Sequence, residues 1–244
     1  MAIELAGHGV PTVVLDDNNV VSVGSRAICW SKRSLEIFDR LGIAERALDK
    51  GVTWRVGRTF HREAEVFSVD LLPEDGHRMP AFLNLQQYYV EQFLVERAQE
   101  IPLIDLRFKN KVVGLDPGPT GAILDIETPD GPYALEARNV VACDGARSPL
   151  RGMLGLTFEG EVFAERFLIA DIEMEADFPS ERLFGFEPEL HAGQSALLHK
   201  QPDNIYRIDL QLGEDANPEH EMKPEVVIPR IVNAVGHDDF RLDW

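Results

Sequence analysis

The sequence predicts an α/β fold that opens partway through a βαβ unit and ends in a mostly antiparallel sheet. At the start, the apolar helical residues 2–6 are followed by the glycine stop Gly7-His8-Gly9, the β-branched run Val10–Leu15 and the acid Asp16. A helix, a glycine stop, a buried parallel strand and an acid form the second half of a dinucleotide-binding βαβ unit. Beyond Arg151 the chain alternates apolar and polar residues, which is typical of antiparallel strands with one face open to water or a ligand. These alternating stretches are 166–174, 194–200 and 205–212.

The first half of that βαβ unit is expected to be missing. It would consist of a strand and a G-x-G-x-x-G turn, whereas Met1 already lies within the predicted helix. The missing strand is normally central in its sheet, so its absence leaves an edge of unpaired backbone groups. We therefore expect the chain by itself to be poorly stable or prone to aggregate.

The remaining elements follow from periodicity and turn residues. A helix is predicted from Ser25 to Leu41, closed by Gly42, and a second helix from Gln87 to Gln99. A hairpin is predicted around Asp130-Gly131. The other predicted elements are strands at 53–60, 64–71, 81–85, 106–115 and 139–143, and a last helix at 225–235.

Composition narrows the class of protein. The chain of 244 residues is 44% hydrophobic and carries a formal charge of −18, from 42 acidic and 24 basic residues. A field of that sign repels nucleic acid and anionic membranes, so neither is expected as a partner. Cys29 and Cys143 are far apart and form no CxxC motif, which argues against a disulfide framework or a zinc site. Neither a signal peptide nor a membrane helix is predicted, and a cytoplasmic location is expected.

Three single residues are candidates for holding a nucleotide cofactor. Asp16 ends the first strand, where a carboxylate can accept hydrogen bonds from both ribose hydroxyls of an adenosine. Arg26, near a predicted helix start, could pair with a diphosphate, although a solvated arginine is the alternative. Gln87 begins a helix, where its amide could meet a ribitol or act only as a cap.

The tract VVACDGARSPLR, residues 140–151, is the strongest motif. It predicts a buried strand that ends in Asp144-Gly145, where glycine lets the backbone approach a ligand closely. Asp144 can accept from a sugar hydroxyl or orient an arginine, and Arg147 and Arg151 can meet phosphate. Taken alone, the tract could also be an ordinary strand-to-helix turn.

This tract resembles the Asp-Gly motif of the FAD-dependent aromatic hydroxylases, the single-component flavoprotein monooxygenases related to p-hydroxybenzoate hydroxylase. The tracts GSRAICWSKRSLEIFDRLG, residues 24–42, and NLQQYYVEQFLVERA, residues 84–98, resemble one branch in particular. That branch contains 3-(3-hydroxyphenyl)propionate hydroxylase and phenol-type hydroxylases. The likeness runs over essentially the whole chain.

The resemblance implies roles for individual residues. Asp16 matches the acid at the adenosine ribose of FAD, and Val113 matches a backbone contact to adenine. Arg26 matches the arginine near the FAD diphosphate, and Gln87 the glutamine near the flavin chain. Asp144, followed by Gly145 and Arg147, matches the acid that serves both FAD and NAD(P)H, and Arg151 follows these residues in the same motif. No catalytic side chain and no metal site are implied.

The resemblance also implies how the chain divides. Residues 1–160 would be an incomplete FAD-binding, Rossmann-like domain of the glutathione-reductase type, with a small strand insertion at about 52–83. Residues 161–244 would be part of a substrate-binding domain. The family's third flavin motif, a Gly-Asp followed by Ala-Ala-His and prolines, is absent from the sequence, so the chain is similar to a middle section of the enzyme.

For the whole enzyme, the resemblance implies hydroxylation of a phenolic or aromatic compound with FAD, NAD(P)H and O2. A homodimer is one expected assembly. The protein's task is then to bind, to orient and to keep water away, so no acid–base triad is needed. His61, His77, His191, His199, His220 and His237 are interpreted as solvated. Whether His199, Tyr206 and Gln211 face a substrate cavity or solvent is left open.

Two alternatives belong to other classes. One is a truncated, non-catalytic chain, because a lost diphosphate turn removes backbone donors and a helix N-terminus that would bind the phosphates. The other is an unrelated nucleotide-fold protein such as a methyltransferase, which also places an acid after its second strand. The 140–151 tract speaks against the methyltransferase.

Overall fold

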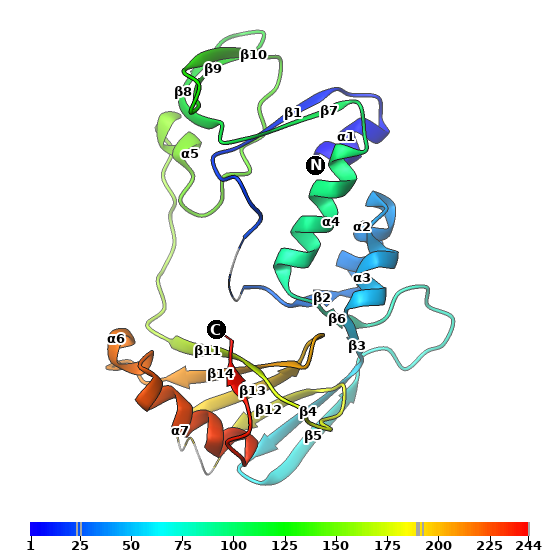
Figure 1. The fold of residues 1–244 in the computed structure, drawn as a ribbon, viewed down its shortest axis with the longest axis vertical. Helices are drawn as coiled ribbons and strands as arrows, with labels where there is room; N and C mark the ends of the chain where they lie inside the picture. The colour runs from blue at the N-terminus through cyan, green and yellow to red at the C-terminus, as the bar shows by residue number, and fades with distance from the viewer. Residues whose placement is uncertain (23, 25, 189–190, 192, 244) are drawn as a thin grey trace. The chain divides into compact units, whose positions relative to one another are not determined.

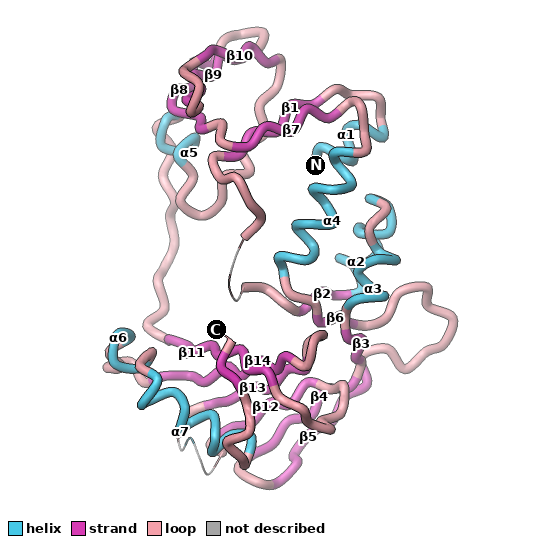
Figure 2. The backbone as a smooth tube through the Cα atoms, viewed as in Figure 1, coloured by secondary structure: helices cyan, strands magenta, loops and turns pink. Residues whose placement is uncertain are grey.

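The computed structural model describes residues 1–22, 24, 26–188, 191 and 193–243. It contains two compact units, each described by itself below. Unit 1 comprises Met1–Val21 and Val95–Val162, and unit 2 comprises Ser22–Leu94 and the chain from Phe163 onward. Figure 1 labels the helices and strands, and Figure 2 distinguishes helix, strand and loop along the backbone. Among the described residues, no helix is long and apolar enough to cross a membrane.

Unit 1 holds the nucleotide-binding pattern that the sequence predicts. Its elements are α1 (Ala2–Gly7), β1 (Thr12–Asp16), β7 (Ile104–Phe108), β8 (Lys111–Pro117), β9 (Ala122–Glu127), β10 (Tyr133–Ala137) and α5 (Pro149–Met153). Strand β1 runs parallel to β7, with Thr12 opposite Ile104. The predicted glycine stop after α1 is confirmed, since Gly9 has a φ of 76°.

Two strand predictions in unit 1 need correction. The expected strand 106–115 is two strands, β7 and β8, because the chain turns at Lys109, whose φ is 56°. The expected buried strand 139–143 does not form, and Val141 is 56% exposed. A strand needs a hydrogen-bonded neighbour, and β1 pairs only with β7 among the described residues. The hairpin around Asp130-Gly131 is confirmed as β9 and β10.

Unit 2 is built around a seven-stranded sheet of order β15-β11-β14-β13-β12-β4-β5. Every pair of adjacent strands in this sheet is antiparallel except β12 and β4, which are parallel. The predicted mostly antiparallel sheet is therefore confirmed. Its strands are β4 (Val56–His61), β5 (Ala64–Asp70), β11 (Arg166–Glu173), β12 (Arg182–Phe186), β13 (Ser195–Lys200), β14 (Ile205–Leu212) and β15 (Arg241–Leu242). Strands β4 and β5, expected as a separate insertion, thus belong to this sheet. The division at residue 160 stays a prediction.

Helix α7 (Pro224–Val235) covers one face of this sheet (Figure 1). Every second residue of β14 points toward it, so Tyr206, Ile208 and Leu210 are buried in one cluster with Ile231 of the helix. The short helix α6 (Pro218–Glu221) precedes α7. Because side chains alternate along a strand, Arg207, Asp209 and Gln211 lie on the opposite face of the sheet.

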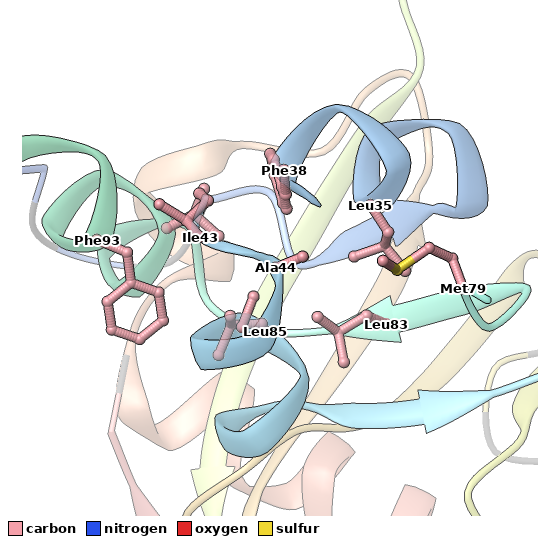
Figure 3. Packing of buried hydrophobic residues seen from close by; sticks show 10 residues of the cluster. Leu35, Phe38, Ile43, Ala44, Met79, Leu83, Leu85 and Phe93 are labelled. Carbon is pink, nitrogen blue, oxygen red and sulfur yellow. The ribbon is translucent and has the colours of Figure 1, made fainter. Parts of the chain in front are cut away.

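A second apolar core in unit 2 joins helices to a three-stranded sheet of order β2-β6-β3. Its elements are β2 (Cys29–Ser31), α2 (Lys32–Leu41), α3 (Ala44–Lys50), β3 (Val52–Trp54), β6 (Phe82–Asn84) and the start of α4 (Gln87–Gln99). Figure 3 shows Leu35 and Phe38 of α2 lying with Leu83 of β6 and Phe93 of α4.

The predicted helix 25–41 begins later than expected, at Lys32. Residues 29–31 pair with β6 instead, with Cys29 opposite Asn84, and Ser31 then caps the helix by accepting the Ser34 N–H. Arg26 therefore lies in a loop before β2, and Ser25 lies outside the described residues. The predicted stop at Gly42 is confirmed by its φ of 81°.

Candidate functional site

Asp16 lies exposed at the carboxyl end of β1, where a parallel strand presents ligand-binding residues. Its Oδ1 accepts the Asn18 N–H at 2.8 Å, which fixes the turn after the strand. Its carbonyl accepts the N–H of Asn110 at 2.9 Å, from the turn between β7 and β8. The carboxylate is therefore held in place by its own backbone and remains open to solvent.

Val113 interrupts the ladder between β8 and β9. The register passes from Val112 opposite Ile126 to Gly114 opposite Asp125, so Val113 has no opposing residue there. Such a bulge leaves the extra residue outside the ladder, where its backbone can meet a ligand. Leu15, next to Asp16, packs in the same cluster as Val112, so the two predicted adenosine contacts lie in one region of unit 1.

Asp144 and Gly145 form a tight loop before α5. Gly145 has a φ of 79°, and a side chain there would meet no neighbouring atom, so the loop surface is open. The Asp144 Oδ2 accepts the Leu150 N–H at 3.0 Å. Desolvation raises the pKa of Asp144, but hydrogen bonds from Ser148 and from backbone N–H groups outweigh it and hold the pKa below its usual value.

Arg147 and Arg151 differ in this loop. The Arg151 Nη2 donates to the Ala146 carbonyl at 2.8 Å, and its guanidinium lies 4.9 Å from the centre of the Phe158 ring. Arg151 therefore stabilises its own loop. Arg147 is exposed, which suits a residue that meets a phosphate.

We expect Asp144→Ala to lower the free energy of unfolding of unit 1 by about 0.5–2 kcal/mol, because it removes the acceptor that caps the Leu150 N–H in the first turn of α5, beside the N-cap residue Ser148. Urea unfolding followed by circular dichroism measures this. Asp130→Ala, at the exposed hairpin turn of the same unit, is the control and should change stability little. Equal effects of the two substitutions would contradict the capping role.

Glu91 of unit 2, which the sequence did not single out, accepts a hydrogen bond from Gln87 and is influenced by the charge of Arg26. Glu91, one turn along α4, accepts the Gln87 amide at 2.5 Å and the Ser22 N–H at 2.6 Å. Burial raises the pKa of Glu91, but these hydrogen bonds and the charge of Arg26 lower it overall. The i, i+4 spacing of Gln87 and Glu91 was the available signal.

The sheet face opposite α7 holds a buried polar cluster, also missed by the sequence. The Arg207 guanidinium donates to both carboxylate oxygens of Asp171, at 2.9 and 3.1 Å, and also to the Arg26 carbonyl. Gln201 donates to the Asp171 Oδ1 at 3.2 Å. This cluster ties the loop that carries Arg26 to the sheet.

The histidine prediction is wrong for His199, which is buried on that same face beside Arg207. Burial lowers the pKa of His199 to about 4, and the charges of Arg182 and Arg207 act in the same direction. Gln211 shares this face and accepts the Ser195 hydroxyl at 2.8 Å. Tyr206 lies on the α7 face, where its hydroxyl donates to the Ala176 carbonyl at 2.7 Å.

One surface hollow of about 490 Å³ lies elsewhere in unit 2, bordered by Thr53, His77 and Ser180 among others. None of the predicted site residues borders it, so it is not the candidate site.

The fold and the site residues together define the class: an α/β FAD-binding fold with an acid after a parallel strand and an Asp-Gly loop. Residues 1–244 match the family model described as "FAD binding domain". The chain belongs to this FAD-binding monooxygenase family. That membership sets the methyltransferase alternative aside.

Two curated relatives show how much of the family the chain represents. It is 21% identical over 235 residues to a 3-(3-hydroxy-phenyl)propionate/3-hydroxycinnamic acid hydroxylase of Mycolicibacterium smegmatis, covering 96% of the chain and 41% of the relative. It is 35% identical over 176 residues to a rifampicin monooxygenase of Streptomyces venezuelae, covering 72% of the chain and 35% of the relative. The chain thus spans less than half the length of these relatives.

Solved structures share the fold. The p-nitrophenol 4-monooxygenase PnpA of Pseudomonas putida DLL-E4 matches with a TM-score of 0.84 and 23% identity, over 100% of this chain and 62% of that one. The flavin-dependent monooxygenase PieE, crystallised with FAD and substrate, matches with a TM-score of 0.83 and 21% identity, over 99% and 46%.

The residues of this chain have the chemistry needed to bind the adenosine and the phosphate-bearing chain of FAD. An exposed carboxylate at Asp16 and a bulged backbone at Val113 are acceptors and donors for a ribose and an adenine. The open glycine at Gly145 and the exposed Arg147 suit a phosphate-bearing chain.

Proposed function

We propose that the protein containing this chain hydroxylates a phenolic or related aromatic ring, using FAD, NAD(P)H and O2. One structural observation supports this activity in addition to the family membership. The loop that holds Arg26, the expected diphosphate contact, is hydrogen-bonded through Arg207 to the face of the seven-stranded sheet opposite α7. The loop that we expect to contact the diphosphate therefore adjoins the polar face of the sheet within unit 2, and we assign that face to the substrate.

The chain's residues then have the following tasks. Asp16 accepts hydrogen bonds from the adenosine ribose, and the Val113 backbone meets the adenine. Arg26 pairs with the diphosphate, while Glu91 holds Gln87 in place for the flavin chain. Asp144, Gly145 and Arg147 serve FAD and NAD(P)H. When bound, FAD supplies the redox chemistry that joins NAD(P)H, O2 and the aromatic ring.

A non-catalytic chain that binds FAD weakly is the second candidate. This candidate is favoured by the small size of the parallel sheet, which consists of β1 and β7 alone. Among the described residues no further strand pairs with β1 or β7, so the backbone groups at both edges of this sheet are left without a strand partner. The cytoplasmic location and the homodimer stay predictions.

The purified chain distinguishes the two candidates by FAD titration, followed by flavin fluorescence and the visible spectrum. Saturable binding near one FAD per chain, followed by NAD(P)H oxidation when phenols are added, would support the hydroxylase. A colourless chain that takes up no added FAD would refute the proposal that this chain is itself active. The family assignment would not be affected by that result.

Asp16→Ala is expected to raise the dissociation constant for FAD about 10- to 100-fold, because it removes hydrogen bonds to a charged group. Asp130→Ala, an exposed acid of the same unit, serves as the matched control and should leave FAD binding unchanged. Equal affinities for Asp16→Ala and the unsubstituted chain would remove Asp16 from the site.

A further inference from the structure

The guanidinium of Arg207 on β14 donates to two separate groups of unit 2. Its Nε and Nη2 donate to the two carboxylate oxygens of Asp171, at 2.9 and 3.1 Å. Its Nη1 donates to the backbone carbonyl of Arg26. A bidentate pair with a carboxylate fixes the plane of a guanidinium, so the pair with Asp171 also fixes the direction in which Nη1 points. The place of the Arg26 carbonyl is therefore set by a side chain of the sheet.

The Arg207 donor is held firmly because its surroundings exclude water. Arg207 is 4% exposed and Asp171 is 5% exposed. The amide of Gln201 donates to the Asp171 Oδ1 at 3.2 Å and holds that carboxylate from another side. Charge-assisted hydrogen bonds are stronger where water is excluded. The contact between Arg207 and the Arg26 carbonyl is therefore a strong link between the sheet and the backbone that carries Arg26.

The Arg26 loop, residues 26–28 before β2, is held at its other end as well. The Leu85 N–H donates to the Ile28 carbonyl at 2.8 Å, and the next residue, Cys29, pairs with Asn84 of β6. The side chain of Arg26 is exposed. The backbone of the Arg26 loop is thus fixed at both ends, while the cation that it carries is open to solvent.

A role of Arg207 in stability alone does not need the hydrogen bond to Arg26. The charge of Asp171 is compensated by Nε and Nη2, and a lysine ammonium at this position would compensate it too. A donor that is directed at the backbone of a loop instead restricts the conformations of that loop before a ligand binds. A loop that is already ordered loses less conformational entropy on binding, which raises affinity without a new contact to the ligand.

We propose that Arg207 is a positioning residue for the cofactor, because it fixes the Arg26 loop in the conformation that receives the diphosphate. The inference rests on the proposed function, in which Arg26 pairs with that diphosphate. Arg207 acts through Arg26 and needs no contact with FAD. Asp171 takes part only by orienting Arg207.

Trypsin reports on the Arg26 loop without any FAD, because the bond that it hydrolyses after Arg26 contains the carbonyl that Arg207 holds. Cleavage of a folded chain by a protease follows the population of locally opened forms. Arg207→Lys keeps a charge beside Asp171 but lacks the planar fork, so cleavage after Arg26 should become about tenfold faster. Mass spectrometry measures this rate relative to cleavage after Arg62, in the exposed turn between β4 and β5 of the same unit.

The affinity for FAD, measured by flavin fluorescence, should fall about tenfold in Arg207→Lys. The double variant Asp171→Leu with Arg207→Leu removes both buried charges as well as the donor to Arg26. It should show the same two changes although no unpaired charge is left, which separates positioning from stability. Arg241→Lys is the matched control, since Arg241 pairs with Glu173 at the surface of the same sheet, and it should change neither quantity.

An unchanged cleavage ratio in Arg207→Lys would overturn the inference. So would a ratio that rises equally in Arg241→Lys, or an FAD affinity that Arg207→Lys leaves unaltered. These outcomes are distinct from failure of the proposed function. A chain that takes up no FAD, but in which Arg207→Lys still accelerates cleavage after Arg26, refutes the activity of the chain and supports the fixed loop. A chain that is an active hydroxylase with unaltered affinity in Arg207→Lys refutes only the role of Arg207.

Discussion

Replacing Asp171 by alanine is expected to lower the free energy of unfolding of unit 2 by about 3–5 kcal/mol. Asp171 and Arg207 are both buried, and the carboxylate accepts two hydrogen bonds from the guanidinium and one from Gln201. Removing one partner of a buried ion pair leaves the other charge desolvated without compensation, which is what makes the loss large. Urea unfolding followed by tryptophan fluorescence measures it.

The same strand provides a matched control. Glu173, two residues along β11, pairs with Arg241 at the surface, where the side chains are 43% and 70% exposed. Exposed ion pairs contribute little, so Glu173→Ala should cost under about 1 kcal/mol. A second variant, Asp171→Leu with Arg207→Leu, should recover much of the lost stability, because an apolar pair needs no compensation. Similar losses for Asp171→Ala and Glu173→Ala would show that the buried pair has no special role.

The sequence correctly predicted those helices and strands whose ends are determined by residues close by in the chain. Helix α4 forms over the predicted residues 87–99, and β14 over 205–212, because periodicity and turns specify them locally. The helix expected from Ser25 starts at Lys32 because pairing of Cys29 with Asn84, far along the chain, takes precedence over helix propensity. The strand expected at 139–143 also depends on a distant partner, and among the described residues these positions pair with no other strand.

The site was predicted unevenly for the same reason. Asp16 and Gly145 follow from short motifs, and their places at a strand end and in a positive-φ loop agree with those motifs. Their contacts to FAD stay predictions. The polar face of the large sheet could not be predicted, because alternation shows that a strand has two faces without showing which one is covered. Only the packing of α7 on Tyr206 assigns Asp209 and His199 to the other face.

Asp209→Asn is expected to stabilise unit 2 above pH 6 and to have little effect near pH 4. The pKa of Asp209 rises from 3.8 to about 6 on folding, chiefly through burial. The folded chain thus binds a proton more tightly than the unfolded chain, so stability is highest below pH 3.8 and falls as the pH rises through about 6. The difference of about two pKa units corresponds to about 3 kcal/mol, which the asparagine variant regains at neutral pH.

Thermal and urea unfolding of the two chains from pH 4 to pH 8 measure the difference. His199, whose pKa falls to about 4 on folding, makes both chains less stable as the pH drops below its ordinary value of 6.5. Because the His199 Nε2 lies 3.8 Å from the Asp209 Oδ2, the two groups titrate as a coupled pair, so the Asp209 contribution is taken at pH 8, where His199 is neutral in the folded and the unfolded chain. Asp215→Asn should show no such pH dependence relative to the unsubstituted chain. A stability gain for Asp209→Asn that is the same at pH 4 and pH 8 would contradict a burial-raised pKa of Asp209 and would mean that its carboxylate is solvated in the folded chain.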